Sequence, residues 1–186
     1  MTVDYLLSIQ WYNLFNQGLV APGLAVFMST ILIWGLVVGF LYKSLILRKG
    51  SLRELTASLL SAAGFYFLLS LINLWWFRPR PFVVGHFVAL INVSPAISSF
   101  PSGHSALAWL LAGLLAEEDK ANAWWFYLLA LVVALGRVAV GVHYFSDVLA
   151  GAILGWLFSR GAIWLRQQHW FLPGDFVNKR RSWVIK

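Results

Sequence analysis

Two long stretches without charge constrain this chain more than any other feature. Residues 21–42 and 55–77 carry no ionisable side chain apart from the phenols of Tyr42 and Tyr66. Each exceeds the roughly 20 apolar residues with which a helix crosses a hydrocarbon core of about 30 Å. The composition agrees, because 60% of the residues are hydrophobic and only 11% are charged. We therefore predict an all-α, polytopic membrane helical bundle.

The spacing of the apolar stretches predicts how the bundle is organised. We expect five transmembrane spans, preceded by an amphipathic helix on the outer interface. The predicted spans are 19–42, 54–77, 102–117, 121–141 and 145–166, and the interfacial helix is 3–17. A chain of 186 residues leaves no length for a second core, so residues 1–186 form a single domain. Disulfides and thiol chemistry are excluded because there is no cysteine.

The basic residues predict the orientation in the membrane. Eleven of the 14 lysines and arginines fall between the first two spans, in the loop 117–122, or at the end of the chain. The positive-inside rule places these segments in the cytoplasm, so the loop 78–101 faces outward and the C-terminus faces inward. Membrane topology thus explains the net charge of +7, and we expect no nucleic-acid partner.

Short polar segments interrupt the apolar sequence at residues 78–81 (RPRP), 101–104 (PSGH) and 137–147 (RVAVGVHYFSD). Charged groups inside a bilayer usually face a polar cavity or a partner. At a rise of 1.5 Å per residue, His104 and Asp147 lie about 20 Å above the cytoplasmic edge and Arg137 about 26 Å above it. Three predicted helices therefore bring polar groups to one level, which predicts a single site near the outer face.

These residue types suit phosphoryl transfer, which needs cations for the phosphate oxygens, a nucleophile and an acid. Arg80 and Arg137 would bind phosphate through their planar guanidinium groups, with Arg78 as a helper. The alternative for Arg78 is that it only marks the membrane edge. Pro79 and Pro81 are expected to keep this loop free of helix.

The remaining site residues would supply the helix start and the reacting groups. Ser102 would cap a helix, and Gly103 would let an anion approach the free amides there. His104 would protonate the leaving oxygen. His143 would attack phosphorus, with Asp147 fixing its tautomer, to give a phosphohistidine that water hydrolyses. The alternative for this His–Asp pair is helix capping or an ordinary polar contact.

The order Arg-Pro, then Pro-Ser-Gly-His, then Arg-x5-His-x3-Asp resembles the type-2 phosphatidic acid phosphatase superfamily over about residues 55–165. Within it, residues 76–83 and 99–102 look most like the bacterial undecaprenyl-diphosphatases of the bacitracin-resistance type. The resemblance implies no metal and no other cofactor. It also implies a role for each matching residue: phosphate binding by Arg80, Arg137, Ser102 and Gly103, general acid catalysis by His104, nucleophilic attack by His143, and orientation of that histidine by Asp147.

The implied function is hydrolysis of undecaprenyl diphosphate to undecaprenyl phosphate at the outer face, which regenerates the carrier lipid for peptidoglycan synthesis. Three positions depart from the pattern: Asn73 replaces a lysine, Gly136 a serine, and Gly103 an aspartate common in that branch. Arg78 would then take the place of the missing lysine. Two alternatives stay open. One is a phosphatase of phosphatidylglycerol phosphate, phosphatidate or a lipid A phosphate, and the other is a non-catalytic lipid-binding or transport protein.

Three further polar features are expected to lie outside the site. His86 would be a surface histidine of the outer loop, and His169 would belong to the cytoplasmic tail. The acidic cluster 117–119 would be solvated surface at the far side of the membrane rather than a metal site.

Overall fold

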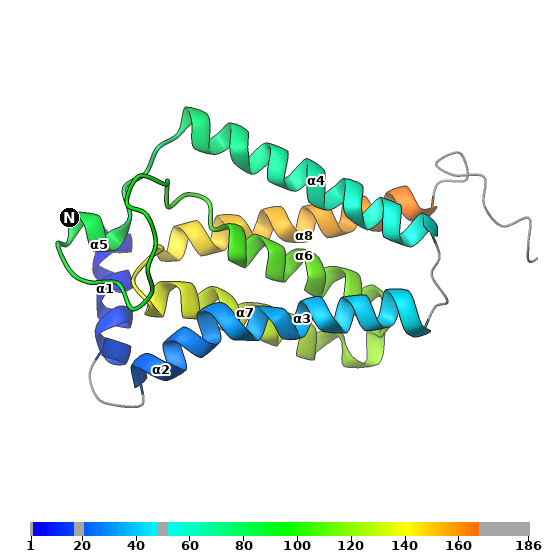
Figure 1. The fold of residues 1–186 in the computed structure, drawn as a ribbon, viewed down its shortest axis with the longest axis horizontal. Coiled ribbons are helices and arrows are strands. Elements are labelled where there is room, and N and C mark those ends of the chain that lie inside the picture. Colours follow the sequence, from blue (N-terminus) through cyan, green and yellow to red (C-terminus); the bar gives the residue numbers. More distant parts are fainter. Residues whose placement is uncertain (1, 17–20, 48–51, 168–186) are drawn as a thin grey trace, which may run out of the picture.

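A computed structural model describes residues 2–16, 21–47 and 52–167, and these ranges contain helices but no strand. The long helices run side by side along one axis (Figure 1). The predicted all-α bundle is therefore confirmed. In chain order the elements are α1 (Val3–Asn16), α2 (Ala21–Val26), the π-helical η1 (Phe27–Ile31), α3 (Leu32–Leu41), the π-helical η2 (Tyr42–Leu47), α4 (Leu52–Trp75), α5 (Pro81–Val84), α6 (Gly103–Glu118), the 3-10 helix η3 (Lys120–Asn122), α7 (Ala123–Ala139) and α8 (Phe145–Gln167).

Within the described ranges, four helical segments are long and apolar enough to cross a membrane: Ala21–Ser44, Thr56–Trp75, Lys120–Ala139 and Phe145–Gln167. They correspond to four of the five predicted spans, although residues 19 and 20 lie outside the described part. The fifth predicted span, 102–117, is α6. With 16 residues it is about 24 Å long, which is short for a helix that faces lipid.

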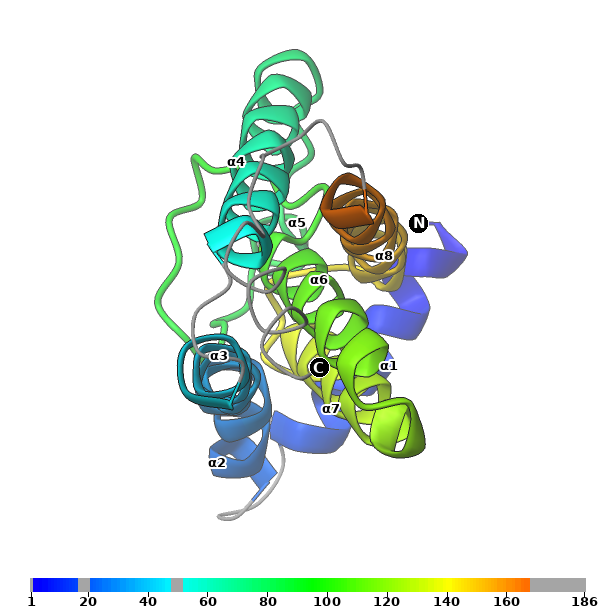
Figure 2. The same cartoon turned by 90° about the vertical axis from the view of Figure 1, so that its right-hand side faces the viewer.

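The short helix α6 lies at the centre of the bundle, with α3, α4, α7 and α8 around it (Figure 2). Ten of its 16 residues are buried, including Leu110, Leu114 and Leu115. Since neighbouring helices rather than lipid surround most of α6, its length need not match the bilayer. Its apolar residues form the core with α3, α7 and α8.

Helices α6 and α8 approach each other closely because α8 presents two glycines four residues apart. A Cβ atom at Gly151 would lie 2.5 Å from the Ser102 carbonyl oxygen, and one at Gly155 would lie 2.0 Å from that of Ala106. Small residues at this spacing let two membrane helices pack backbone to backbone. The contact fixes the start of α6 beside the start of α8.

At the same end of the bundle, α1 runs across the ends of the long helices, near α5 and the loop that follows it (Figure 1). Its buried residues are Ser8 and Tyr12, and the Trp11 indole donates a hydrogen bond to the Leu135 carbonyl at 3.1 Å. This crosswise position is the one expected of the predicted helix 3–17, whose last residue lies outside the described part.

The opposite end of the bundle carries ion pairs. Each acidic residue of the 117–119 turn has a basic partner: Glu117 with Arg160, Glu118 with Arg166 and Asp119 with Lys43. The prediction of a solvated acidic surface fails for the Glu118 side chain, which is only 9% exposed, whereas those of Glu117 and Asp119 are partly exposed. The predicted cytoplasmic residues Arg48, Lys49, His169, Lys179, Arg180, Arg181 and Lys186 lie outside the described residues.

Candidate active site

The first turn of α6 forms as predicted. Ser102 is the N-cap residue and is fully buried, and its hydroxyl accepts a long hydrogen bond from the Ser105 amide at 3.5 Å. Gly103 and His104 are the first two residues of the helix. The His104 side chain is exposed at a cavity of about 270 Å³ that is also lined by Trp34 and Tyr66. The N-terminus of a helix favours an anion, because its free amides and dipole face outward.

Arg80 is buried, and it joins the loop after α5 to the turn before α8. Its guanidinium donates to the carbonyl oxygens of Ile97 (3.1 Å), Val142 (2.9 Å) and Ser98 (3.2 Å). A guanidinium has five N–H donors, so two remain for a ligand. Residues 76–80 are free of helix, as predicted, but Pro81 begins the short helix α5 and Arg80 is its N-cap residue. Proline is well tolerated at the first helical position, where its missing N–H has no partner to lose.

Arg137 lies in the last turn of α7 and is 4% exposed. One terminal nitrogen donates to the Ser29 hydroxyl at 3.0 Å, whereas its buried Nε has no partner among the residues that the structure describes. No carboxylate in that part of the chain forms an ion pair with Arg80 or Arg137. A buried charge without a partner is costly, so an orphaned guanidinium donor indicates an anion site.

The two arginines share one region with both histidines. The charges of Arg80 and Arg137 act on His104 and on His143, and His143 also acts on His104. These groups come from the loop before α5, the end of α7, the start of α6 and the turn before α8. The predicted convergence of separate segments on one site is thus present at one end of the bundle.

His143 is 4% exposed and lies in the turn just before α8. Its Nδ1 lies 2.7 Å from the Ser99 carbonyl oxygen, which can only accept, so Nδ1 carries the proton and Nε2 keeps a free lone pair. Burial lowers the pKa of His143 to about 4, which keeps the imidazole neutral. The arrangement suits a nucleophile.

Asp147 lies beside His143, as the sequence predicts, but the two side chains are too far apart for a hydrogen bond. Its Oδ2 lies 3.6 Å from His143 Nδ1, beyond hydrogen-bond distance, and accepts from the Tyr144 amide at 2.9 Å. Because α8 begins at Phe145, Asp147 is its third residue and caps the helix start. The capping alternative describes this contact, the Ser99 carbonyl is the closer partner of the imidazole, and orientation of His143 by Asp147 stays a prediction.

The guanidinium of Arg78 contacts carboxylates. Its Nη2 pairs with Asp4 at 2.8 Å and its Nη1 with Asp147 at 2.5 Å. The same group lies 3.9 Å from the centre of the Tyr144 ring, within range of a cation–π contact. These contacts already balance the charge of Arg78, so its binding of phosphate stays a prediction.

Ser29, Ser99 and Asp4 contact the predicted site residues but were not themselves predicted. The signal for Ser29 is a hydroxyl within the uncharged stretch 21–42. Its position also explains Gly136, since a Cβ atom there would lie 2.7 Å from the Ser29 backbone nitrogen. A serine at position 136 would clash, and the hydroxyl beside Arg137 comes from Ser29 instead.

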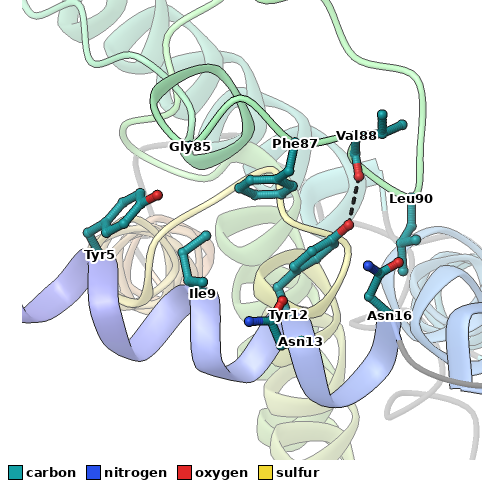
Figure 3. A pocket seen from close by; sticks show the side chains of 9 residues that line it. All are labelled: Tyr5, Ile9, Tyr12, Asn13, Asn16, Gly85, Phe87, Val88 and Leu90. Carbon is teal, nitrogen blue, oxygen red and sulfur yellow. Dashed lines mark hydrogen bonds between the residues drawn. The ribbon is translucent and has the colours of Figure 1, made fainter.

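Two other observations delimit the site. A larger cavity of about 540 Å³ lies between α1 and residues 85–90, and none of the predicted site residues lines it (Figure 3). Across the described residues, no group of three or more His, Asp or Glu side chains could hold a metal ion. His86 is exposed, as predicted.

Fold and site together define a helical membrane protein with two buried arginines and two histidines gathered at one end of the bundle. The profile of the PAP2 superfamily matches residues 54–171, more than half of the chain, and the chain therefore belongs to that superfamily. The resemblance seen in the sequence motifs is confirmed. No solved structure matches the chain.

Several curated proteins are similar over shorter stretches. The undecaprenyl-diphosphatase BcrC of Bacillus subtilis is 35% identical over 100 residues, which cover 52% of this chain and 51% of that protein. The bacitracin transport permease protein BcrC of Bacillus licheniformis is 37% identical over 83 residues, or 42% and 41% of the two chains. A lipid A 1-phosphatase of Porphyromonas gingivalis is 34% identical over 74 residues, or 38% and 17%. The similarity thus spans about half, or less, of each relative.

Proposed function

We propose that the chain is an integral-membrane phosphatase that converts undecaprenyl diphosphate to undecaprenyl phosphate at the outer face of the membrane. The observation that carries the proposal is the pair of buried arginines, Arg80 and Arg137, which lack ion-pair partners in the described part and lie beside His143. Membership of the PAP2 superfamily supports phosphatase chemistry. Similarity to the undecaprenyl-diphosphatase of Bacillus subtilis supports the lipid.

The terminal phosphate would bind at the start of α6. Arg137 offers its unpaired Nε, Arg80 offers its two remaining N–H groups, and the amides of Gly103 and His104 face out from the helix start. The apolar cavity beside His104 lies between η1, α3, α4 and α6. It would receive the part of the prenyl chain nearest to the phosphate.

Catalysis would proceed in two displacements. His143 Nε2 attacks the terminal phosphorus, so that a P–N bond forms while the P–O bond to the lipid phosphate breaks. His104 gives its proton to the leaving oxygen. The Ser99 carbonyl keeps the Nδ1 proton in place, and the Asp147 charge, 3.6 Å away, offsets the positive charge of the phosphorylated imidazole. Water, deprotonated by His104, then breaks the P–N bond and releases inorganic phosphate.

The proposed orientation follows from the charges at the other end of the bundle. Lys43, Arg160 and Arg166 lie at that end together with the 117–119 turn. The positive-inside rule would place this end in the cytoplasm, the site outside and the C-terminus inside. The bilayer is then the only partner that the proposal needs besides the lipid substrate.

A second candidate keeps the site and changes the lipid. Similarity to a lipid A 1-phosphatase favours a lipid A phosphate, and phosphatidylglycerol phosphate and phosphatidate would fit the same chemistry. A non-catalytic lipid-binding or transport protein is the candidate of another class. This candidate is motivated by two departures from the family pattern, Asn73 in place of a lysine and Gly136 in place of a serine. Ser29 compensates for the missing serine, because its hydroxyl lies beside Arg137.

The test is phosphate release by the purified full chain in detergent micelles, measured on undecaprenyl diphosphate and the three other lipids. We expect release to be fastest from undecaprenyl diphosphate and to be abolished in His143→Ala. The matched control is His86→Asn, which changes an exposed histidine at a positive φ of 50° to a residue that tolerates this conformation. A strong preference for a glycerolipid would overturn undecaprenyl diphosphate as the substrate. A folded wild type that releases no phosphate from any of the lipids would favour the non-catalytic candidate.

A further inference from the structure

Asp4 connects the crosswise helix α1 to the start of α8 by hydrogen bonds. The Asp4 carboxylate accepts hydrogen bonds from the Ser146 amide at 3.2 Å, from the Ser146 hydroxyl and from Arg78 at 2.8 Å. Burial raises the pKa of Asp4, but these hydrogen bonds outweigh it and keep the pKa below its ordinary value. Asp4 is therefore charged at neutral pH.

Arg78 contacts both groups that face Nδ1 of His143. Its guanidinium donates to Asp147 Oδ1, and its backbone carbonyl accepts a hydrogen bond from the Ser99 amide at 2.9 Å. The Ser99 carbonyl in turn accepts a hydrogen bond from His143 Nδ1, with 2.7 Å between oxygen and nitrogen. A single residue therefore fixes the carbonyl that selects the tautomer and the carboxylate that balances the imidazole charge.

We infer that Asp4 and Arg78 are positioning residues for His143: Asp4 orients the Arg78 guanidinium, and Arg78 keeps the Ser99 carbonyl and the Asp147 carboxylate beside the imidazole. The inference rests on the proposed function and extends it to α1, outside residues 54–171 that match the family. Without Asp4, Arg78 would have Asp147 as its only carboxylate partner in the described part. The positive charge of Arg78 would then be offset by one carboxylate instead of two.

The charges around His143 decide how each substitution changes its titration. The charges that act on it are those of Arg80 from the loop before α5, Arg137 from α7 and Asp147 from α8, and His143 in turn acts on His104 of α6. Arg78 and Asp4 lie on the other side of the Asp147 carboxylate, which Arg78 contacts directly. Removing the negative charge of Asp4 makes this region more positive and disfavours the imidazolium. Removing the positive charge of Arg78 does the opposite. A purely structural role would not produce shifts of opposite sign.

A second anchor of α1 provides the matched control. The Tyr12 hydroxyl donates to the Val88 carbonyl at 2.8 Å, so Tyr12→Phe loosens the same helix without changing any charge (Figure 3). Tyr12 is 5% exposed, and losing its hydrogen bond destabilises the protein as losing one at Asp4 does. Any difference between the two variants in kcat or in titration then reports on positioning rather than on the docking of α1.

The experiment measures kcat, KM, the pH profile of kcat/KM and thermal stability in micelles for wild type, Asp4→Asn, Arg78→Gln and Tyr12→Phe. For Asp4→Asn we expect kcat to fall about tenfold, or about 1.4 kcal/mol in activation free energy, with KM changed less than about twofold. The acidic limb of the pH profile of kcat/KM should move to lower pH in Asp4→Asn and to higher pH in Arg78→Gln. Tyr12→Phe should be less stable, with unchanged kcat and pH profile.

The outcomes separate the inference from the function on which it rests. If Asp4→Asn keeps the wild-type kcat and an unshifted pH profile, the positioning role is overturned. It is also overturned if Asp4→Asn and Tyr12→Phe change kcat and the pH profile to the same extent. If Arg78→Gln fails to fold, because two carboxylates then lose their cation, the comparison of Asp4→Asn with Tyr12→Phe still decides. A folded wild type that is inactive on every lipid overturns the proposed function itself, and this role with it.

Discussion

The contact between α6 and α8 can be tested by adding a single methyl group at Gly155. The new Cβ atom of Gly155→Ala would lie 2.0 Å from the Ala106 carbonyl oxygen, 2.8 Å from its carbonyl carbon and 3.0 Å from its Cα. All three atoms belong to the backbone of α6, so no side chain can rotate away. Because real Cβ contacts stay above 3.0 Å, the two helices must separate by at least about 1 Å here.

The separation should lower both stability and activity. Overpacking of this kind typically costs about 1–3 kcal/mol, which for a chain of this length lowers Tm by at least about 2 °C. Ala106 lies two residues after His104, and the Ser102 amide is bonded to the Asp147 carbonyl at 3.1 Å. A shift of α6 therefore moves His104 relative to His143. A misplacement of about 1 Å can reduce catalysis about a hundredfold.

The assay compares Gly155→Ala with Gly161→Ala on the same helix. A Cβ atom at Gly161 would have nothing within 4 Å, so alanine there should stabilise α8 by about 0.5–1 kcal/mol and leave phosphate release unchanged. Thermal unfolding in micelles and phosphate release from undecaprenyl diphosphate are measured on both variants. Wild-type stability and activity in Gly155→Ala would refute the proposed backbone contact.

Two further predictions concern the site itself. Arg80→Lys cannot reproduce the planar set of hydrogen bonds to Ile97, Ser98 and Val142, and we expect it to be less stable by about 2 kcal/mol and at least tenfold lower in kcat/KM, as measured by thermal unfolding and phosphate release. For His143, burial lowers the folded pKa from 6.5 to about 4, so the folded state binds fewer protons than the unfolded chain between these values. The contribution of His143 to stability should therefore decline as the pH falls from about 6.5 to about 4, while its imidazole stays neutral down to about pH 4. Thermal unfolding of wild type and His143→Gln across this range measures the difference, and parallel pH dependences would contradict it.

The sequence by itself determined the class of fold and most of the candidate site. Uncharged stretches of more than 20 residues leave helices across a bilayer as the natural solution, and their length sets the span positions to within a few residues. The spacing of Arg137, His143 and Asp147 and the cap at Ser102 are local features, fixed by a few consecutive residues. They could be predicted because helix rise and capping depend on nearby sequence.

Tertiary structure alone decided which polar groups meet. Ser29 lies 108 positions before Arg137, and Asp4 lies 74 positions before Arg78, and no local pattern links either pair. The sequence predicted a hydrogen bond between His143 and Asp147, but Arg78 and the Tyr144 amide bind that carboxylate, and the Ser99 carbonyl accepts the hydrogen bond of the imidazole N–H. Such choices follow from how closely α6, α7 and α8 pack. That packing depends on contacts between residues far apart in the chain, such as Gly155 with Ala106, which local sequence does not specify.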